Sequence, residues 1–343
     1  MGGPYTAAGL LWFLVFVYAV AGSVDFGATF WRMFYLRKGQ HEAAGVAERY
    51  VSPLWEATNV FLVLIGVVLV GFFPGATFAM GTLLLWPGAA ALILLAIRGA
   101  ALGFAYAGGG LADVLPYVSG ATAILLPALL VSMLTVSQGG FTSAGGAGLV
   151  LDFGLLLHSA REYAYVGFAL AAVLFLSATF LADYAKTARS HSAYRVYRVN
   201  ALWLGPVMML AGVAAIFLGP SDSWLLPRLR AEWPWFLGSL LAFCAALPVW
   251  WWPGRNSAGP VAPGRPRLAV LLAALQFSLA DIGYGLAHAP YILFPQVTTV
   301  AAFSNQAMFR DLLWVTVLGL AILVPGFVWL WRLFITDPRY TRG

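Results

Sequence analysis

Long apolar runs separated by short polar segments make up almost the whole chain. Nine runs reach the roughly 20 residues that a helix needs to cross a bilayer. They lie at residues 7–35, 52–73, 77–106, 114–137, 161–186, 199–219, 233–252, 267–288 and 309–335. The runs are unbroken, whereas the strands of a membrane barrel alternate apolar and polar residues over about ten positions. The pattern therefore predicts an all-α polytopic membrane protein with nine transmembrane helices.

Composition supports the same class of protein. Of the 343 residues, 62% are hydrophobic and 9% are charged, against about 25% charged residues in an ordinary soluble domain. This composition excludes a soluble globular enzyme and a disordered chain. The single cysteine, Cys244, lies in an apolar run, so a disulfide scaffold is excluded as well. We expect one integral membrane domain over residues 1–343.

The positions of lysine and arginine predict the orientation in the membrane. If the N-terminus lies outside, fifteen of these residues fall in inner segments and four in outer ones. The outer ones are Arg161, Arg228, Arg230 and Arg310. Because cytoplasmic loops are enriched in positive charge, we expect a multi-pass protein of the plasma membrane with a cytoplasmic C-terminus. The same asymmetry explains the net charge of +6, so no nucleic-acid partner is expected.

Two carboxylates lie at membrane depth near the inner side. Asp25 precedes Arg32 by seven residues, and Glu56 follows Arg49 by seven residues. At about 1.5 Å per residue, each lies roughly 10 Å above the inner basic layer. The two helices are consecutive and antiparallel, so both carboxylates should share one layer. Since charge is costly in a membrane, such residues usually face the bundle interior and serve a proton or ion path.

Polar neighbours extend this acidic layer. Ser23 and Thr58 add hydroxyl groups, Asn59 adds an amide, and Trp55 adjoins Glu56. We interpret the set as an inner half-channel for protons. A structural alternative stays open, in which the carboxylates bond to helix backbones or pair with Arg98.

Asp281 is a third carboxylate at membrane depth. It follows Arg267 by fourteen residues, which puts it about 21 Å from the inner edge and in the outer half of the bilayer. Gly283 and Gly285 would allow another helix to approach closely. Asp281 then forms either a polar site facing a helix or a second subunit, or a packing and capping contact.

The histidines argue against a haem held by this chain. His41 and His191 fall in inner loops, and His158 and His288 fall near outer helix ends. Haem iron needs axial ligands at a fixed depth, and none of these residues lies in the middle of a predicted span. The chain also has no Walker, GxSxG or HExxH sequence. We expect no catalytic residue, cofactor ligand or metal ligand here.

Several stretches, taken in order, resemble subunit II of the cytochrome bd-type quinol oxidases. The resemblance is strongest over residues 8–104 and 281–335. The stretches that carry it are Gly22-Ser23-Val24-Asp25-Phe26-Gly27, Pro53-Leu54-Trp55-Glu56-Ala57-Thr58-Asn59-Val60-Phe61-Leu62, Arg98-Gly99 closing the third helix, and Pro290-Tyr291-Ile292-Leu293-Phe294-Pro295 with Val297-Thr298.

The resemblance implies two four-helix bundles and one peripheral helix. On this chain the first bundle would be residues 1–137 and the second residues 161–288. Residues 138–160 would form an outer loop, and residues 309–335 the last helix.

The resemblance also implies a function in a complex that oxidises quinol and reduces O2 to water with cytoplasmic protons. Subunit I would carry haem b and haem d, and this chain would supply a proton pathway and a scaffold. Asp25 matches the family's acidic position on helix one, while Trp55 and Glu56 match its Trp-Asp/Glu pair. Many relatives have Gly-Asn-Gln-Val-Trp where this chain has residues 57–61, although Thr58 keeps a hydroxyl. A structural quinone and a small single-helix subunit are left open.

Two other functions are compatible with buried carboxylates. A self-contained proton-coupled transporter would also need them, but no convincing inverted repeat supports it. A purely structural subunit would use them for assembly alone.

Overall fold

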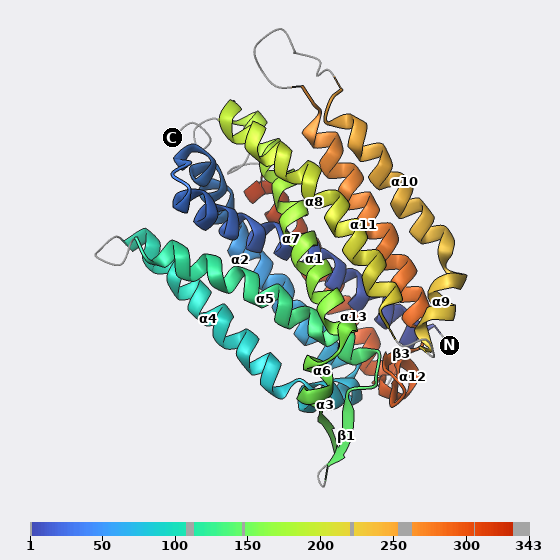
Figure 1. Ribbon diagram of the computed structural model, residues 1–343. Helices are drawn as coiled ribbons and strands as arrows, with labels where there is room; N and C mark the ends of the chain where they lie inside the picture. Colours follow the sequence, from blue (N-terminus) through green and yellow to red (C-terminus); the bar gives the residue numbers. More distant parts are fainter. Residues whose placement is uncertain are drawn as a thin grey trace.

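The computed structural model describes residues 2–107, 113–145, 148–219, 223–252, 263–304 and 306–331. The chain is mostly helical, and its long helices run along one common direction (Figure 1). They are α1 (Gly3–Arg37), α2 (His41–Phe72), α4 (Leu85–Ala107), α5 (Leu115–Ser137), α7 (Ala160–Thr187), α8 (His191–Phe217), α10 (Trp233–Val249), α11 (Pro266–His288) and α13 (Gln306–Trp331).

Short elements gather at the end of the bundle where α1 begins (Figure 1). Four are helices: α3 (Pro74–Leu83), α6 (Phe153–Leu157), α9 (Leu225–Ala231) and α12 (Thr299–Ala302). The others are two antiparallel ribbons, β1 (Thr142–Gly145) with β2 (Gly148–Leu151) and β3 (Tyr291–Leu293) with β4 (Val297–Thr298). Together these elements cap one end of the bundle.

The described residues contain seven helices that are long and apolar enough to cross a membrane. Two bent pairs, α2 with α3 at 120° and α9 with α10 at 67°, bring the number to nine if each pair is one span. The protein is therefore a polytopic helical membrane protein.

The predicted third span, residues 77–106, was wrong in its first part. Residues 77–83 belong to α3, and the long helix begins at Leu85. The cause is local, since the break falls at Leu84 and Pro87, in the first turn of α4, has no N–H to donate to the Leu83 carbonyl. The predicted end at residue 106 is confirmed to within one residue, since α4 ends at Ala107, and Arg98-Gly99 therefore lies inside this helix instead of closing it.

Helices α1 and α7 touch through small residues. A Cβ atom added to Gly27 would lie 2.1 Å from Ser177 Oγ and 2.6 Å from the Val173 carbonyl oxygen. The Trp31 indole Nε1 donates to the same Ser177 Oγ at 3.0 Å. The missing side chain at Gly27 is what allows this close crossing.

We expect Gly27→Ala to destabilise the bundle by about 1–3 kcal/mol, the usual cost of overpacking a tight contact. Thermal unfolding of the purified complex measures the loss. Gly9→Ala is the matched control, because Gly9 lies on the same helix and a Cβ there meets nothing within 4 Å. An equal melting temperature for both variants would contradict the close contact.

The two halves of the chain repeat a local pattern. Residues 28–30 on α1 and 178–180 on α7 both read Ala-Thr-Phe. In each, the threonine hydroxyl donates to the carbonyl four residues earlier, that of Asp25 in α1 and of Phe175 in α7. The acidic residue of the first half is thus replaced by an aromatic one in the second.

Candidate proton site

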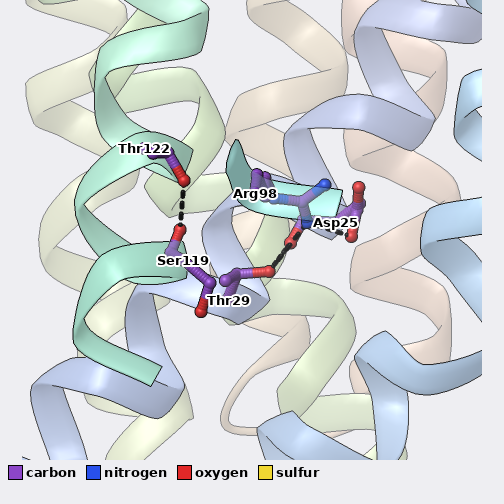
Figure 2. Close-up of polar contacts among 5 residues, drawn as sticks. All are labelled: Asp25, Thr29, Arg98, Ser119 and Thr122. Carbon is purple, nitrogen blue, oxygen red and sulfur yellow. Dashed lines mark hydrogen bonds and ion pairs between the residues drawn. The ribbon is translucent and has the colours of Figure 1, made fainter. Parts of the chain in front are cut away.

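A buried ion pair joins α1 to α4. Arg98 Nη2 lies 2.7 Å from Asp25 Oδ1, and the two side chains are 2% and 1% exposed. The same nitrogen donates to Thr29 Oγ1 at 2.9 Å. Figure 2 shows Arg98 reaching Asp25 and Thr29 together. The sequence predicted Asp25 as a buried carboxylate and left pairing with Arg98 open as the alternative; the structure shows this pair.

Thr29 anchors the pair to the helix backbone. Its hydroxyl donates to the Asp25 carbonyl oxygen at 2.9 Å, so it accepts from Arg98 with a lone pair. The ring of Phe26 lies 5.0 Å from the guanidinium carbon of Arg98, within the range of a cation–π contact. Arg98 is therefore held by a carboxylate, a hydroxyl and an aromatic face, which compensates its charge at this depth.

Several polar atoms of the ion pair and beside it lack hydrogen-bond partners in the described part of the chain. Asp25 Oδ2, Arg98 Nε and the Tyr18 hydroxyl are buried and have no hydrogen-bond partner in the described part of the chain. A buried polar atom normally has a partner, because leaving it unpaired costs free energy. The free carboxylate oxygen is thus the place where a proton or another polar group could bind.

The predicted neighbours on α2 are described in part. Thr58 is buried, and its methyl carbon would lie 3.7 Å from a Cβ on Gly22, one turn before Asp25. Asn59 is half-buried. The backbone at Trp55 and Glu56 is helical, but their side chains lie outside the described residues. The structure therefore brings Thr58 to the site.

Ser23 lies on another side of α1. It lies two positions before Asp25, and a step of two positions rotates a helix by about 200°. It is half-buried, and this rotation directs its side chain away from the side of α1 that carries Asp25.

Two hydroxyls on α5 lie near the ion pair and were missed in the sequence. Ser119 and Thr122 are buried and appear beside Thr29 in Figure 2. The Thr122 hydroxyl donates to the Ser119 carbonyl at 2.9 Å, and Ser119 donates to the Pro116 carbonyl at 3.1 Å. Their protons are committed to their own helix, so they make this face polar without extending the pair. Their spacing of three residues, which places both hydroxyls on one face of a helix, was the sequence signal that could have identified them.

Asp281 lies where α11 approaches α1. Its carbonyl oxygen accepts from the Trp12 indole at 2.9 Å, and its side chain is half-buried. A Cβ on Gly285 would lie 2.4 Å from Trp12 Nε1, and one on Gly283 would lie 2.8 Å from Trp235 Cβ. The close approach predicted from these glycines is confirmed. The function of the carboxylate itself stays a prediction.

A second polar cluster joins α5, α7 and α11, and no pattern in the sequence pointed to it. Gln138 Nε2 donates to the hydroxyls of Tyr165 and Tyr284, both at 2.7 Å. Arg161 Nη2 donates to the Gly139 carbonyl at 2.9 Å, and Arg161 as a whole is 7% exposed. Arg161 was expected as an outer charge; it lies in the first turn of α7 but is buried by this cluster.

The histidines all lie at helix ends. His41 and His191 begin α2 and α8, His158 follows α6, and His288 ends α11. The described residues contain no group of three or more His, Cys, Asp or Glu side chains that could hold a metal ion.

The structure thus defines a polytopic helical membrane protein with an ion pair buried between its helices. The chain belongs to the family described as cytochrome bd terminal oxidase subunit II, whose model matches residues 4–334. The resemblance noted in the sequence is therefore confirmed, and the transporter is not favoured.

Relatives agree over almost the full length. The chain is 39% identical over 337 residues to a Bacillus subtilis (strain 168) protein described as a cytochrome bd menaquinol oxidase subunit II, covering 98% of this chain and 96% of the relative. It is also similar to a chain in the structure of the bd oxidase from Geobacillus thermodenitrificans, with 31% identity and a TM-score of 0.80. That match covers 98% of this chain and all of the other. The chain is thus a subunit II of a bd-type quinol oxidase.

Proposed function

We propose that this subunit supplies the cytoplasmic proton pathway and the scaffold for a haem-bearing subunit I. The partner carries haem b and haem d, oxidises quinol and reduces O2 to water. Menaquinol, named for the Bacillus subtilis relative, is the quinol that we assign to this complex. The observation that carries the proposal is the buried Asp25 carboxylate, with one oxygen on Arg98 and the other without a partner in the described part of the chain.

Glu56 delivers protons to this carboxylate. Thr58 packs on Gly22 and so gives the register of α2 against α1. Glu56 is two residues from Thr58 and Asp25 three residues from Gly22, both toward the α1–α2 turn. At about 1.5 Å per residue these offsets are roughly 3 and 4.5 Å, which supports a common layer for the two carboxylates. Trp55 and Asn59 then share this layer, and Ser23, on another side of α1, is not assigned to the path.

The α1–α2 turn faces the cytoplasm in this proposal, and the N-terminus lies outside. Gln306, which begins α13, contacts Gly3 near the start of α1. The 26-residue α13 therefore ends on the opposite side, as an odd number of spans requires. Helices α1, α2, α4 and α5 form the first bundle, α7, α8, α10 and α11 the second, and α13 is peripheral. The complex resides in the bacterial plasma membrane.

We expect the chain to copurify with a second polypeptide that carries haem absorption. The purified complex should consume oxygen when quinol is added, and separated subunits should show the haem on the partner. A colourless preparation that moves a solute into liposomes would instead establish a transporter.

A further inference from the structure

A cluster of cations and aromatic rings lies where α7, α8, α10 and α11 meet, at the opposite end of α10 from α9. We define this basic cluster as Lys186, Tyr194, Arg198, Trp251, Trp252 and Arg265. The Arg198 guanidinium carbon lies 5.6 Å from the Trp251 ring centroid, and that of Arg265 lies 5.5 Å from the Trp252 centroid. Lys186 Nζ lies 5.1 Å from the Tyr194 centroid. Three cations are thus each paired with an aromatic ring.

The backbone holds the cluster in place. The Gly264 N–H donates to the Trp252 carbonyl at 3.1 Å, and the Arg265 N–H donates to the Val249 carbonyl at 3.0 Å. Lys186 donates to the Gly264 carbonyl, while the Tyr194 hydroxyl donates to the Pro263 carbonyl at 2.8 Å. The segment before α11 is therefore folded back onto the end of α10, and the site is built in advance.

The charges of Lys186 and Arg198 are only partly compensated within the described residues. Lys186 and Arg198 repel each other, while Asp183 attracts Lys186. Asp183 also pairs with Arg267 at 3.3 Å. Arg198 Nε is buried without a hydrogen-bond partner in the described part of the chain. An anion placed between these cations would lower their mutual repulsion.

Exposed apolar side chains continue from the cluster along two helices. On α8 they include Val199 and Trp203, and on α10 they include Leu240 and Leu241. Trp251 and Trp252 are 57% and 54% exposed, and tryptophan favours the level of the lipid headgroups. A charged group beside an apolar wall matches an amphiphile better than it matches free phosphate or an acidic peptide.

We propose that the basic cluster binds the phosphate headgroup of an anionic phospholipid, whose acyl chains lie on the apolar side chains of α8 and α10. The inference requires only that the chain lies in a bilayer and does not depend on the proton path. Each basic residue near a membrane surface contributes about 1 kcal/mol, which is a factor of about five in affinity.

The purified oxidase complex, stripped of lipid in detergent, tests the proposal with phosphatidylglycerol as the probe. Native mass spectrometry counts the retained lipid, and thermal unfolding measures the stabilisation. We expect phosphatidylglycerol to be retained and to stabilise the complex, and phosphatidylcholine and inorganic phosphate to do neither. The double variant Arg198→Gln/Arg265→Gln should bind about 25-fold more weakly.

Two further variants act as controls. Arg230→Gln removes an exposed arginine on α9, at the other end of the bundle, and should bind lipid as the wild type does. Arg198→Lys/Arg265→Lys keeps the charges and should keep most of the binding. Equal lipid retention by the Gln/Gln variant and the wild type would overturn the proposal, and so would equal stabilisation by inorganic phosphate.

Discussion

Replacing Asp25 with asparagine is expected to destabilise the oxidase complex by about 3–5 kcal/mol. Arg98 is 1% exposed. The change leaves its buried guanidinium group without a counter-charge. Breaking a buried pair by removing one partner costs that much because the remaining charge stays desolvated. Arg98→Gln should give a loss of similar size for the same reason. Thermal unfolding of the purified complex and the yield of assembled haem report both losses.

The double variant Asp25→Leu/Arg98→Leu separates the structural effect from the proton effect. Replacing both members of a buried ion pair by apolar residues is often neutral for stability, so assembly should recover. If Asp25 carries protons, oxygen uptake per haem should stay low in the recovered complex. A double variant with normal turnover per haem would show that the pair is structural alone.

The Asp25–Arg98 pair shows which part of the site could be predicted from the sequence and which part could not. A carboxylate at membrane depth was readable, because apolar runs mark the spans and Asp25 interrupts one of them. Its partner was not determined, since Arg98 is 73 residues away and α4 packs mainly against α5. Only the arrangement of three helices shows that the arginine crosses to α1. Pairing with Arg98 could be stated as an alternative but not selected.

Two other features of the structure were not predicted from the sequence, for related physical reasons. The break between α3 and α4 at Leu84 was missed, because the apolar run continues across it and hydropathy alone joined these two helices. The cluster around Gln138 joins side chains up to 146 residues apart, and no local pattern encodes such contacts. The close approach at Gly283 and Gly285 was predictable, because small residues have few other uses inside a membrane helix.

Replacing Glu56 with glutamine should slow quinol-dependent oxygen uptake on the order of a hundredfold, the lower limit of what a positioned proton-transfer group contributes. Glutamine has nearly the shape of glutamate and cannot release a proton at neutral pH. Haem content and absorption should stay normal, because the redox centres are assigned to the partner. Turnover per haem in the purified complex is the measurement, and Glu56→Asp should restore part of it.

Glu48→Gln is the matched control. Glu48 lies on the same helix, two turns earlier, and pairs with Arg32 at 2.7 Å with its side chain 45% exposed. The pair is half-buried and lies outside the proposed path, so the loss of the Glu48 charge should leave turnover close to that of the wild type. A slow Glu56→Gln beside a fast Glu48→Gln would mean that the position of the carboxyl matters and not the net charge of α2. Full turnover per haem in Glu56→Gln would remove this residue from the path and leave Asp25 to receive protons by another route.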